Sequence, residues 1–555
     1  MEASEQPVRS HAASTGPGRG SLASAVRAVS GMTLLSRLGG LARDVLVSRI
    51  FGDTALGSAF SAGFAIPNLF RRLFGEGALS AAFIPEYAQA EKQDRAEADR
   101  FSTFTVLTLA IVTCLITVAA EVVLLALLWL LPADADRQLS LRLIMVMLPF
   151  MPFICVTAIL GGMLQVHGRF GPAASGPLVL NGFIIVVGLW HVIRGELGSP
   201  MVAYTLGVAT TLSGLTQAAA FAWLLRRNVS WRSDWREAGA RAKRMWIKLV
   251  PVLIGLGTLQ INTLMDQVIA MWPIWVGPTM AGHAYPLDER SNVIIAAAQR
   301  LYQFPLGVFG IAVATAVFPL LARHADDAPR FASTLRRGLR LSLFIGLPAS
   351  AGLLLVGNDL IATLFGAGRG AVGGEGGRGG FSPEGVARAT AVIIGFAPAI
   401  WAYSVNHVFA RAFYATGDTK TPMRVAVAMV ALNLILNLTF IWWLREAGLA
   451  WSTSLCAIVQ CLILGWLCHT RLHAGAIDRA SALAIARIAA CTVVMAGVVW
   501  VVMRVLPPAD RWSIHVIRAV AGSAVGVAAY GVVTFAAGAA ELRWLVRRGG
   551  DDEVG

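Results

Sequence analysis

Four arginines lie inside stretches of sequence that are otherwise apolar enough to cross a membrane. A charged side chain that faces lipid at the centre of a bilayer costs about 2.5–3.5 kcal/mol even on a lenient insertion scale. These side chains must therefore face protein or a water-filled cavity. Guanidinium groups bind phosphate oxygens in a bidentate manner, so the set predicts a cavity for an anionic, phosphorylated substrate. The four residues are Arg37, Arg43, Arg71 and Arg300.

Acidic neighbours determine how much of this positive charge is compensated. Arg37 and Asp44 are seven residues apart and share a helix face, so they can partly compensate each other. Arg72 and Glu76 have i,i+4 spacing and predict a local pair, which leaves Arg71 as the excess cation. The alternative is a purely structural role, in which backbone carbonyls and the few acids present satisfy each arginine.

A second polar set predicts a candidate cation site. It comprises Asp266, Asn433, Asn437 and Thr453, and the two asparagines are spaced i,i+4 on one helix face. Carboxylate, amide and hydroxyl oxygens suit a small hard cation such as Na⁺, or Asp266 could carry a proton. Interhelical hydrogen bonding without a bound ion is the alternative. The six cysteines form no CxxC or Cys/His spacing, so we expect no further metal site and no cofactor.

The elements that must position these residues are membrane-spanning helices. Of the 555 residues, 56% are apolar and 14% are charged, whereas soluble domains carry about 25% charged residues. With about 20 apolar residues needed for each span, we predict an all-α polytopic membrane protein with about fourteen spans. They cover 27–50, 56–85, 102–131, 141–165, 175–194, 201–225, 247–273, 290–321, 338–356, 387–414, 423–444, 448–468, 482–506 and 515–540.

Basic residues are distributed unevenly between alternate loops. One set, which includes the basic segment 226–248, contains 24 Lys and Arg, and the opposite set contains 7. Basic loops stay in the cytoplasm, so both termini are predicted to be cytoplasmic. The net charge of +14 is then mostly a consequence of topology and does not indicate binding to nucleic acid.

Short internal similarities indicate two pseudo-repeated lobes around a central cavity. GALSAAFIP (77–85) resembles IAVATAVFP (311–319), and transporters are often built from such repeats. The Gly-rich segment 366–380 contains no Gly-Lys-Ser/Thr and is predicted to be a flexible extracytoplasmic loop. The predicted organisation is a disordered cytoplasmic tail (1–23), an N-terminal lobe (24–226), a basic cytoplasmic linker (227–246), a C-terminal lobe (247–471), two additional helices (472–546) and a cytoplasmic tail (547–555).

Four segments around these residues resemble the MurJ/MviN family of lipid II flippases, within the multidrug/oligosaccharidyl-lipid/polysaccharide exporter superfamily. The resemblance extends over about 24–546 and implies fourteen helices in two lobes, with both termini in the cytoplasm. It is carried by SRLGGLARDVLVSRIFG (36–52), IPNLFRRLFGEGALSAAFIPEYA (66–88), QRLYQFPLGVFGIAVATAVFPLLARHA (299–325) and RAFYATGDTKTP (411–422).

The resemblance also implies roles for individual residues. Asn68 and Glu76 match the second-span motif, and the essential cavity arginines of the family fall on Arg37, Arg43, Arg71 and Arg300.

This chain also departs from the family pattern near the cavity. It has Ser58-Ala59-Phe60 where an acidic residue often precedes the aromatic segment, and Gln299 where Asp often precedes the arginine. Both changes remove negative charge near the cavity. The amides Asn433 and Asn437 leave Asp266 as the only acid of the candidate cation site.

We therefore expect a transporter, not an enzyme, in the bacterial cytoplasmic (inner) membrane. Its substrate would be lipid II or a similar polyprenyl-pyrophosphate glycolipid, moved to the outer leaflet by alternating access and required for cell wall synthesis and cell shape. Coupling to Na⁺, H⁺ or the membrane potential would replace ATP. We expect a monomer in contact with membrane lipids and associated with cell wall synthesis proteins.

Three alternatives compete with this prediction. A related exporter could move another polyprenyl-linked polysaccharide unit or a drug. A membrane enzyme acting on polyprenyl phosphates would need clustered acids or a His/Asp pair, and the spans offer isolated acids. A membrane scaffold would leave the arginines unexplained.

Overall fold

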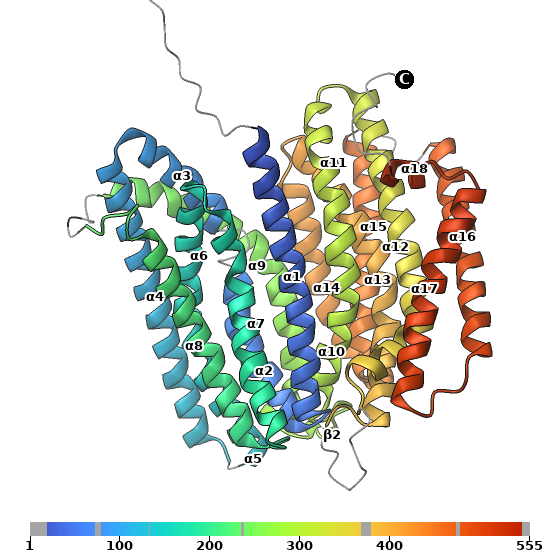
Figure 1. The fold of residues 1–555 in the computed structure, drawn as a ribbon, viewed down its shortest axis with the longest axis horizontal. Helices are drawn as coiled ribbons and strands as arrows, with labels where there is room; N and C mark the ends of the chain where they lie inside the picture. The colour runs from blue at the N-terminus through green and yellow to red at the C-terminus, as the bar shows by residue number, and fades with distance from the viewer. Residues whose placement is uncertain are drawn as a thin grey trace, which may run out of the picture.

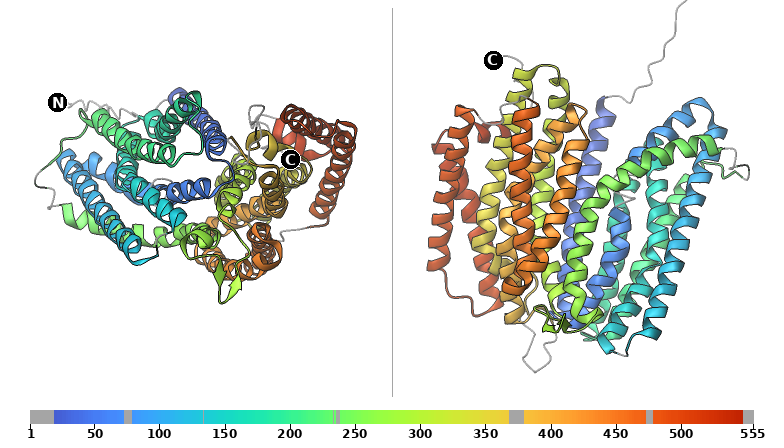
Figure 2. Two further views of the ribbon diagram at one scale, coloured as in Figure 1. Left: turned by 90° about the horizontal axis from the view of Figure 1, so that it is seen from below. Right: turned by 180° about the vertical axis from the view of Figure 1, so that it is seen from behind.

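The computed structural model describes residues 19–72, 79–132, 134–232, 234, 238–367, 379–472 and 478–546. These residues are almost entirely helical and form two groups of helices that stand side by side (Figures 1 and 2). Ten helical segments among them are long and apolar enough to cross a membrane. The helices α1, α2, α9, α10 and α11 are outside those ten, so the number of about fourteen spans stays a prediction.

The first group, here called the N-lobe, packs around one apolar core. Phe83, Phe101, Met147 and Phe150 are fully buried in it. Pro149 separates α5 from α6, because proline lacks the N–H that would continue the helix, so the predicted span 141–165 is two helices. The helices are α1 (Arg19–Phe51), α2 (Ala55–Phe70), α3 (Leu79–Gln93), α4 (Arg95–Leu130), α5 (Ala135–Met147), α6 (Phe150–Val166), α7 (Phe170–Ile193) and α8 (Pro200–Leu225).

The second group, here called the C-lobe, follows the long helix α9 (Gly239–Trp275) and a small hairpin of β1 (Thr279–Met280) and β2 (His283–Ala284). Helices α16 and α17 pack on α12 and lie at the outer edge of the molecule (Figure 1). The helices are α10 (Ser291–Pro305), the π-helix η3 (Leu306–Gly310), α11 (Ile311–Arg323), α12 (Ala328–Leu364), α13 (Pro383–Ala415), α14 (Lys420–Leu444), α15 (Glu446–Arg471), α16 (Arg479–Val505), α17 (Trp512–Ala536) and α18 (Ala540–Val546).

Two predicted spans are interrupted in the structure. In 290–321 the α-helix ends at Pro305, and the π-helix η3 follows it before α11 begins. In 56–85 the α-helix ends at Phe70, and α3 begins at Leu79. Residues 73–78 are outside the described residues, as are 368–378, which make up most of the predicted Gly-rich loop.

The two ends of the bundle are named here by α18 and by the β-hairpin, which lie at opposite ends in Figure 1. At the hairpin end the lobes are joined by polar contacts. Asn292 donates from Nδ2 to the carbonyl of Ser58 at 3.0 Å. Ser382 donates from its backbone N–H and its hydroxyl to the carboxylate of Asp53, at 2.7 and 2.6 Å. The space between the lobes is therefore closed at the hairpin end.

Candidate functional site

A cavity with an open volume of about 1620 Å³ lies between the two lobes. Helices α1, α2 and α7 of the N-lobe, the connecting helix α9, and α10, η3 and α11 of the C-lobe contribute to its wall. The structure brings together the four arginines predicted from the sequence, together with Asn68. Among the described residues, its charged lining consists of five arginines and one carboxylate: Arg37, Arg43, Arg71, Arg72, Arg300 and Asp44.

Asp44 is shared by two arginines that come from opposite lobes. Its Oδ1 accepts from Arg43 Nη2 at 2.7 Å, and its Oδ2 lies 2.9 Å from Arg300 Nε. The predicted compensation between Arg37 and Asp44 is therefore replaced by these two pairs. A partner that comes from another helix cannot be read from helical spacing, so the ion pair of Arg300 was missed.

Arg43 is the most confined of these arginines. It is 8% exposed, and its Nη1 donates to Asn181 Oδ1 at 3.0 Å. Its guanidinium also stacks 4.6 Å from the ring centroid of Phe64, a cation–π contact. Asn181 is fixed in turn, because its Nδ2 donates to the carbonyl of Ser36 at 3.2 Å. Arg43 therefore holds the cavity wall together while presenting positive charge.

Arg71 and Arg72 lie just beyond the end of α2. Arg71 donates from Nε to Oδ1 of Asn68 at 2.7 Å; because the amide is neutral, this bond orients Arg71 without balancing its charge. Arg72 also lines the cavity, which the sequence analysis missed by assigning it to a local pair. The proposed partner, Glu76, is outside the described residues.

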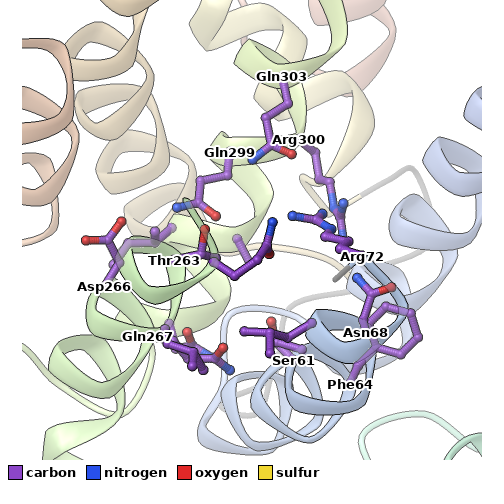
Figure 3. A pocket seen from close by; sticks show the side chains of 17 residues that line it. Ser61, Phe64, Asn68, Arg72, Thr263, Asp266, Gln267, Gln299, Arg300 and Gln303 are labelled. Atoms are coloured by element: carbon purple, nitrogen blue, oxygen red, sulfur yellow. The ribbon is translucent and has the colours of Figure 1, made fainter. Parts of the chain in front are cut away.

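A second, smaller cavity opens beside the arginines (Figure 3). Its open volume is about 790 Å³, and Asn68, Arg72 and Arg300 line both cavities. Side-chain amides dominate its polar lining, contributed by Gln260, Gln267, Asn292, Gln299 and Gln303, which we call the amide wall. These amides were not predicted from the sequence, although their helical spacing could have indicated a shared face.

The candidate cation site is a hydrogen-bonded cluster between α9 and α14. Asn437 donates from Nδ2 to Asp266 Oδ1 at 2.6 Å and to Asn433 Oδ1 at 2.9 Å. Thr453 donates to the carbonyl of Leu449 in its own helix at 3.0 Å. This geometry corresponds to the interhelical hydrogen bonding named above as the alternative. Within the described part of the chain, Asn433 Nδ2 and Asn437 Oδ1 are buried without a partner.

Comparison with known proteins gives consistent similarities. The family model described as "Lipid II flippase MurJ" matches residues 47–518. The "Probable lipid II flippase MurJ" of Rhizobium meliloti is 30% identical over 94% of this chain and 94% of its own length. The protein of the same description from Vibrio cholerae is 29% identical over 84% of this chain and 87% of its own length.

A solved structure agrees in fold. The structure titled "Lipid II flippase MurJ, inward closed conformation" superposes with a TM-score of 0.73 at 21% identity, covering 94% of this chain and 99% of that one.

Proposed function

This chain belongs to the lipid II flippase MurJ family, and on that premise we propose that it transports lipid II or a similar polyprenyl-pyrophosphate glycolipid across the bacterial inner membrane. Peptidoglycan synthesis depends on this supply of precursor outside the cell. The observation that carries the proposal is the central cavity, whose described charged lining is five arginines against one carboxylate. Such a lining attracts a polyanion and repels a cationic drug.

The arginines would bind the pyrophosphate of the substrate. Guanidinium forks match pairs of phosphate oxygens, and Arg71 and Arg300 approach the cavity from different lobes. The cavity is open to solvent, and its open volume of about 1620 Å³ includes that solvent space. The polyprenyl tail would stay in the lipid while the sugar-peptide head occupies the cavity.

Translocation would proceed by alternating access. The bias of Lys and Arg between loops supports an orientation with the hairpin end outside the cell and both termini in the cytoplasm. Contacts such as Ser382 to Asp53 close the hairpin end. The substrate would therefore leave only after the lobes rock apart at that end.

Energy for transport would come from the membrane potential or from an ion gradient. Asp266 has the chemistry to accept a proton, or to bind Na⁺ together with Asn433, Asn437 and Thr453. The hydrogen bond from Asn437 already occupies one oxygen of Asp266, so binding a cation would require this amide to rotate. We further propose that the chain acts as a monomer near the cell wall synthesis proteins that use its product.

The test is head-group translocation in proteoliposomes with the variants Arg37→Ala, Arg71→Ala and Arg300→Ala. We expect each to slow flipping of lipid II at least tenfold, because each removes a phosphate ligand. Arg504→Ala, at the exposed end of α16, is the matched control and should keep the wild-type rate. Normal flipping by all three cavity variants would contradict the proposal. Lost export of another polyprenyl-linked polysaccharide, with normal wall synthesis, would favour the related-exporter alternative.

A further inference from the structure

The amide wall comes from two helices that each present one polar face. On α9, Gln260, Thr263 and Gln267 are spaced i, i+3 and i+7, which places them on one side of the helix. On α10, Asn292, Gln299 and Gln303 are spaced i, i+7 and i+11 and also share a side. The two faces meet at the smaller cavity, where Figure 3 shows their side chains.

One amide of the wall is buried without a partner. Gln267 is 8% exposed, and among the described residues its Nε2 makes no hydrogen bond. Nearly all buried polar groups in folded proteins are hydrogen-bonded, so each exception needs an explanation, of which a bound water, ion or ligand is one. Gln267 lines the smaller cavity and its Nε2 lies beneath the cavity surface, so a ligand there would reach this donor once the amide rotates.

The chemistry of the wall matches neutral polar groups. A side-chain amide offers two N–H donors and a carbonyl acceptor, as needed for hydroxyl and amide groups, which also donate and accept. The amides carry no full charge; among the described residues, the charged groups that line this cavity are Arg72, Arg300 and Asp266, the residue before Gln267. Gln299 directly precedes the cavity arginine Arg300 in the sequence. Both residues line the smaller cavity, so an uncharged amide lies beside the charged group.

The position of the wall fixes which part of the substrate reaches it. Arg72, Arg300 and Asn68 line both cavities, so a pyrophosphate held by the arginines has its substituent directed to one cavity or the other. In a polyprenyl-pyrophosphate glycolipid the group bonded to the pyrophosphate, opposite the lipid, is a sugar. The sugar is therefore the neighbour of the phosphate site, and the peptide is further away.

We propose that the amide wall recognises the sugar of the glycolipid head group, with Gln267 and Gln299 as specificity-determining residues. This assignment rests on the proposed function and adds a second subsite to the phosphate site. The arginines select for a pyrophosphate lipid in general, and the wall distinguishes a sugar-bearing lipid from a bare polyprenyl pyrophosphate.

The experiment compares the binding of two lipids to the full-length protein in nanodiscs: lipid II, and undecaprenyl pyrophosphate, which has no sugar. The double variant Gln267→Met/Gln299→Met keeps the side-chain length and removes both amides. We expect it to bind lipid II about tenfold more weakly, as two lost hydrogen bonds predict, with unchanged affinity for undecaprenyl pyrophosphate. Arg300→Ala should weaken the binding of both lipids.

Gln217→Met is the matched control. Gln217 is a buried amide of α8 that donates to the carbonyl of Ser213 at 3.1 Å, and it lines neither cavity. It should bind both lipids as the wild type does. Unchanged affinity of the double variant for undecaprenyl pyrophosphate also demonstrates that the variant is folded.

Three outcomes would overturn the assignment. If the double variant bound both lipids equally weakly, the wall would be structural. If it bound lipid II normally, the sugar would lie elsewhere. A wild-type chain that bound undecaprenyl pyrophosphate but not lipid II would contradict both the proposed function and the sugar subsite. If the wild type and the double variant both bound the two lipids normally, the sugar subsite would be wrong and the proposed function would stand.

Discussion

At the scale of single residues, Asp44 balances the charge of the cavity. It accepts from Arg43 in its own helix and pairs with Arg300 from the other lobe, at 2.7 and 2.9 Å. A carboxylate in this position neutralises part of the repulsion between the arginines when no substrate is bound. In the proposed binding mode Asp44 would compete with the substrate for Arg300, so the pair would loosen when the pyrophosphate binds.

Replacing Asp44 with Asn should therefore destabilise the protein while leaving its cavity cationic. Exposed ion pairs contribute at most about 1 kcal/mol and breaking a buried pair costs about 3–5 kcal/mol, so we expect a loss of about 2 kcal/mol for this half-buried carboxylate. Thermal unfolding in detergent measures it as a lower midpoint temperature. Asp510→Asn, in the exposed loop before α17, is the control. An unchanged midpoint for Asp44→Asn would show that the pair contributes nothing to stability.

Gly307 makes room for the guanidinium of Arg37. A Cβ built on this glycine would collide with Arg37 Nη1. Because that nitrogen is the far end of a flexible side chain, Gly307→Ala should displace Arg37 and leave the midpoint of unfolding nearly unchanged. We expect flipping to slow several-fold, as in a partial loss of Arg37. Gly352→Ala, in α12 where a Cβ meets nothing within 4 Å, should keep full activity. Full activity of Gly307→Ala would mean that the position of Arg37 is not critical.

The sequence predicted the cavity arginines because charge in an apolar stretch stands out, and it did not predict their partners. Arg37, Arg43, Arg71 and Arg300 all line one cavity, although their binding to substrate stays a prediction. The pair between Asp44 and Arg300 joins residues that are far apart in the chain. Amides such as Gln267 carry no charge, so nothing in composition distinguishes them from ordinary polar residues.

At the scale of elements, the hairpin end closes through the loop between α1 and α2. Asp53 in this loop accepts two hydrogen bonds from Ser382 at the start of α13. Nearby, Ser58 at the start of α2 accepts from the backbone N–H of Val293 at 3.2 Å, and its own carbonyl accepts from Asn292. These contacts are short-range and polar, so water can take the place of each partner when they separate.

A cysteine pair at Asp53 and Ser382 tests whether this closure must open during transport. The two side-chain oxygens are 2.6 Å apart, so the variant Asp53→Cys/Ser382→Cys should form a disulfide under oxidation. We expect oxidation to stop flipping and a reducing agent to restore it. Each single cysteine variant serves as the control and should be insensitive to oxidant. Continued flipping by the crosslinked protein would rule out opening at this contact.

Element positions were more predictable than element ends. All fourteen predicted ranges fall mainly on helical residues wherever the chain is described, because long apolar runs leave the backbone no other way to satisfy its hydrogen bonds in lipid. Hydropathy did not separate α5 from α6 at Pro149, since both sides of the break are apolar. The helices also extend beyond the apolar windows, as in α9, which begins at Gly239 among basic residues.

At the scale of the whole molecule, charge is separated into two populations that have different roles. The loops near the α18 end carry most of the Lys and Arg, 24 against 7 in the opposite set, and set the proposed orientation. The arginines of the cavity are few, but they lie between the lobes. Both lobes contribute arginines, so either lobe could hold the proposed substrate as it moves. We expect the same arrangement to make transport sensitive to the membrane potential.

An inside-negative potential should drive the proposed transport. Each negative charge that moves outward gains about 2.3 kcal/mol per 100 mV, which changes the ratio of outward to inward flux about fiftyfold for each net charge moved. Proteoliposomes with an imposed K⁺ diffusion potential measure this ratio by the accessibility of the lipid II head group. We expect acceleration when the cytoplasmic side is negative and suppression when it is positive.

Two controls separate the potential from an ion gradient. Vesicles with valinomycin but equal K⁺ on both sides carry no potential, and Asp266→Asn removes the carboxylate of the candidate cation site. If the potential acts on the substrate itself, Asp266→Asn should keep the dependence on potential, because the arginines still hold the same anion. If the cation at Asp266 supplies the energy, the variant should lose its dependence on Na⁺ or pH. Equal flux at opposite potentials would mean that the moving lobes carry a compensating charge, which would contradict a purely potential-driven step.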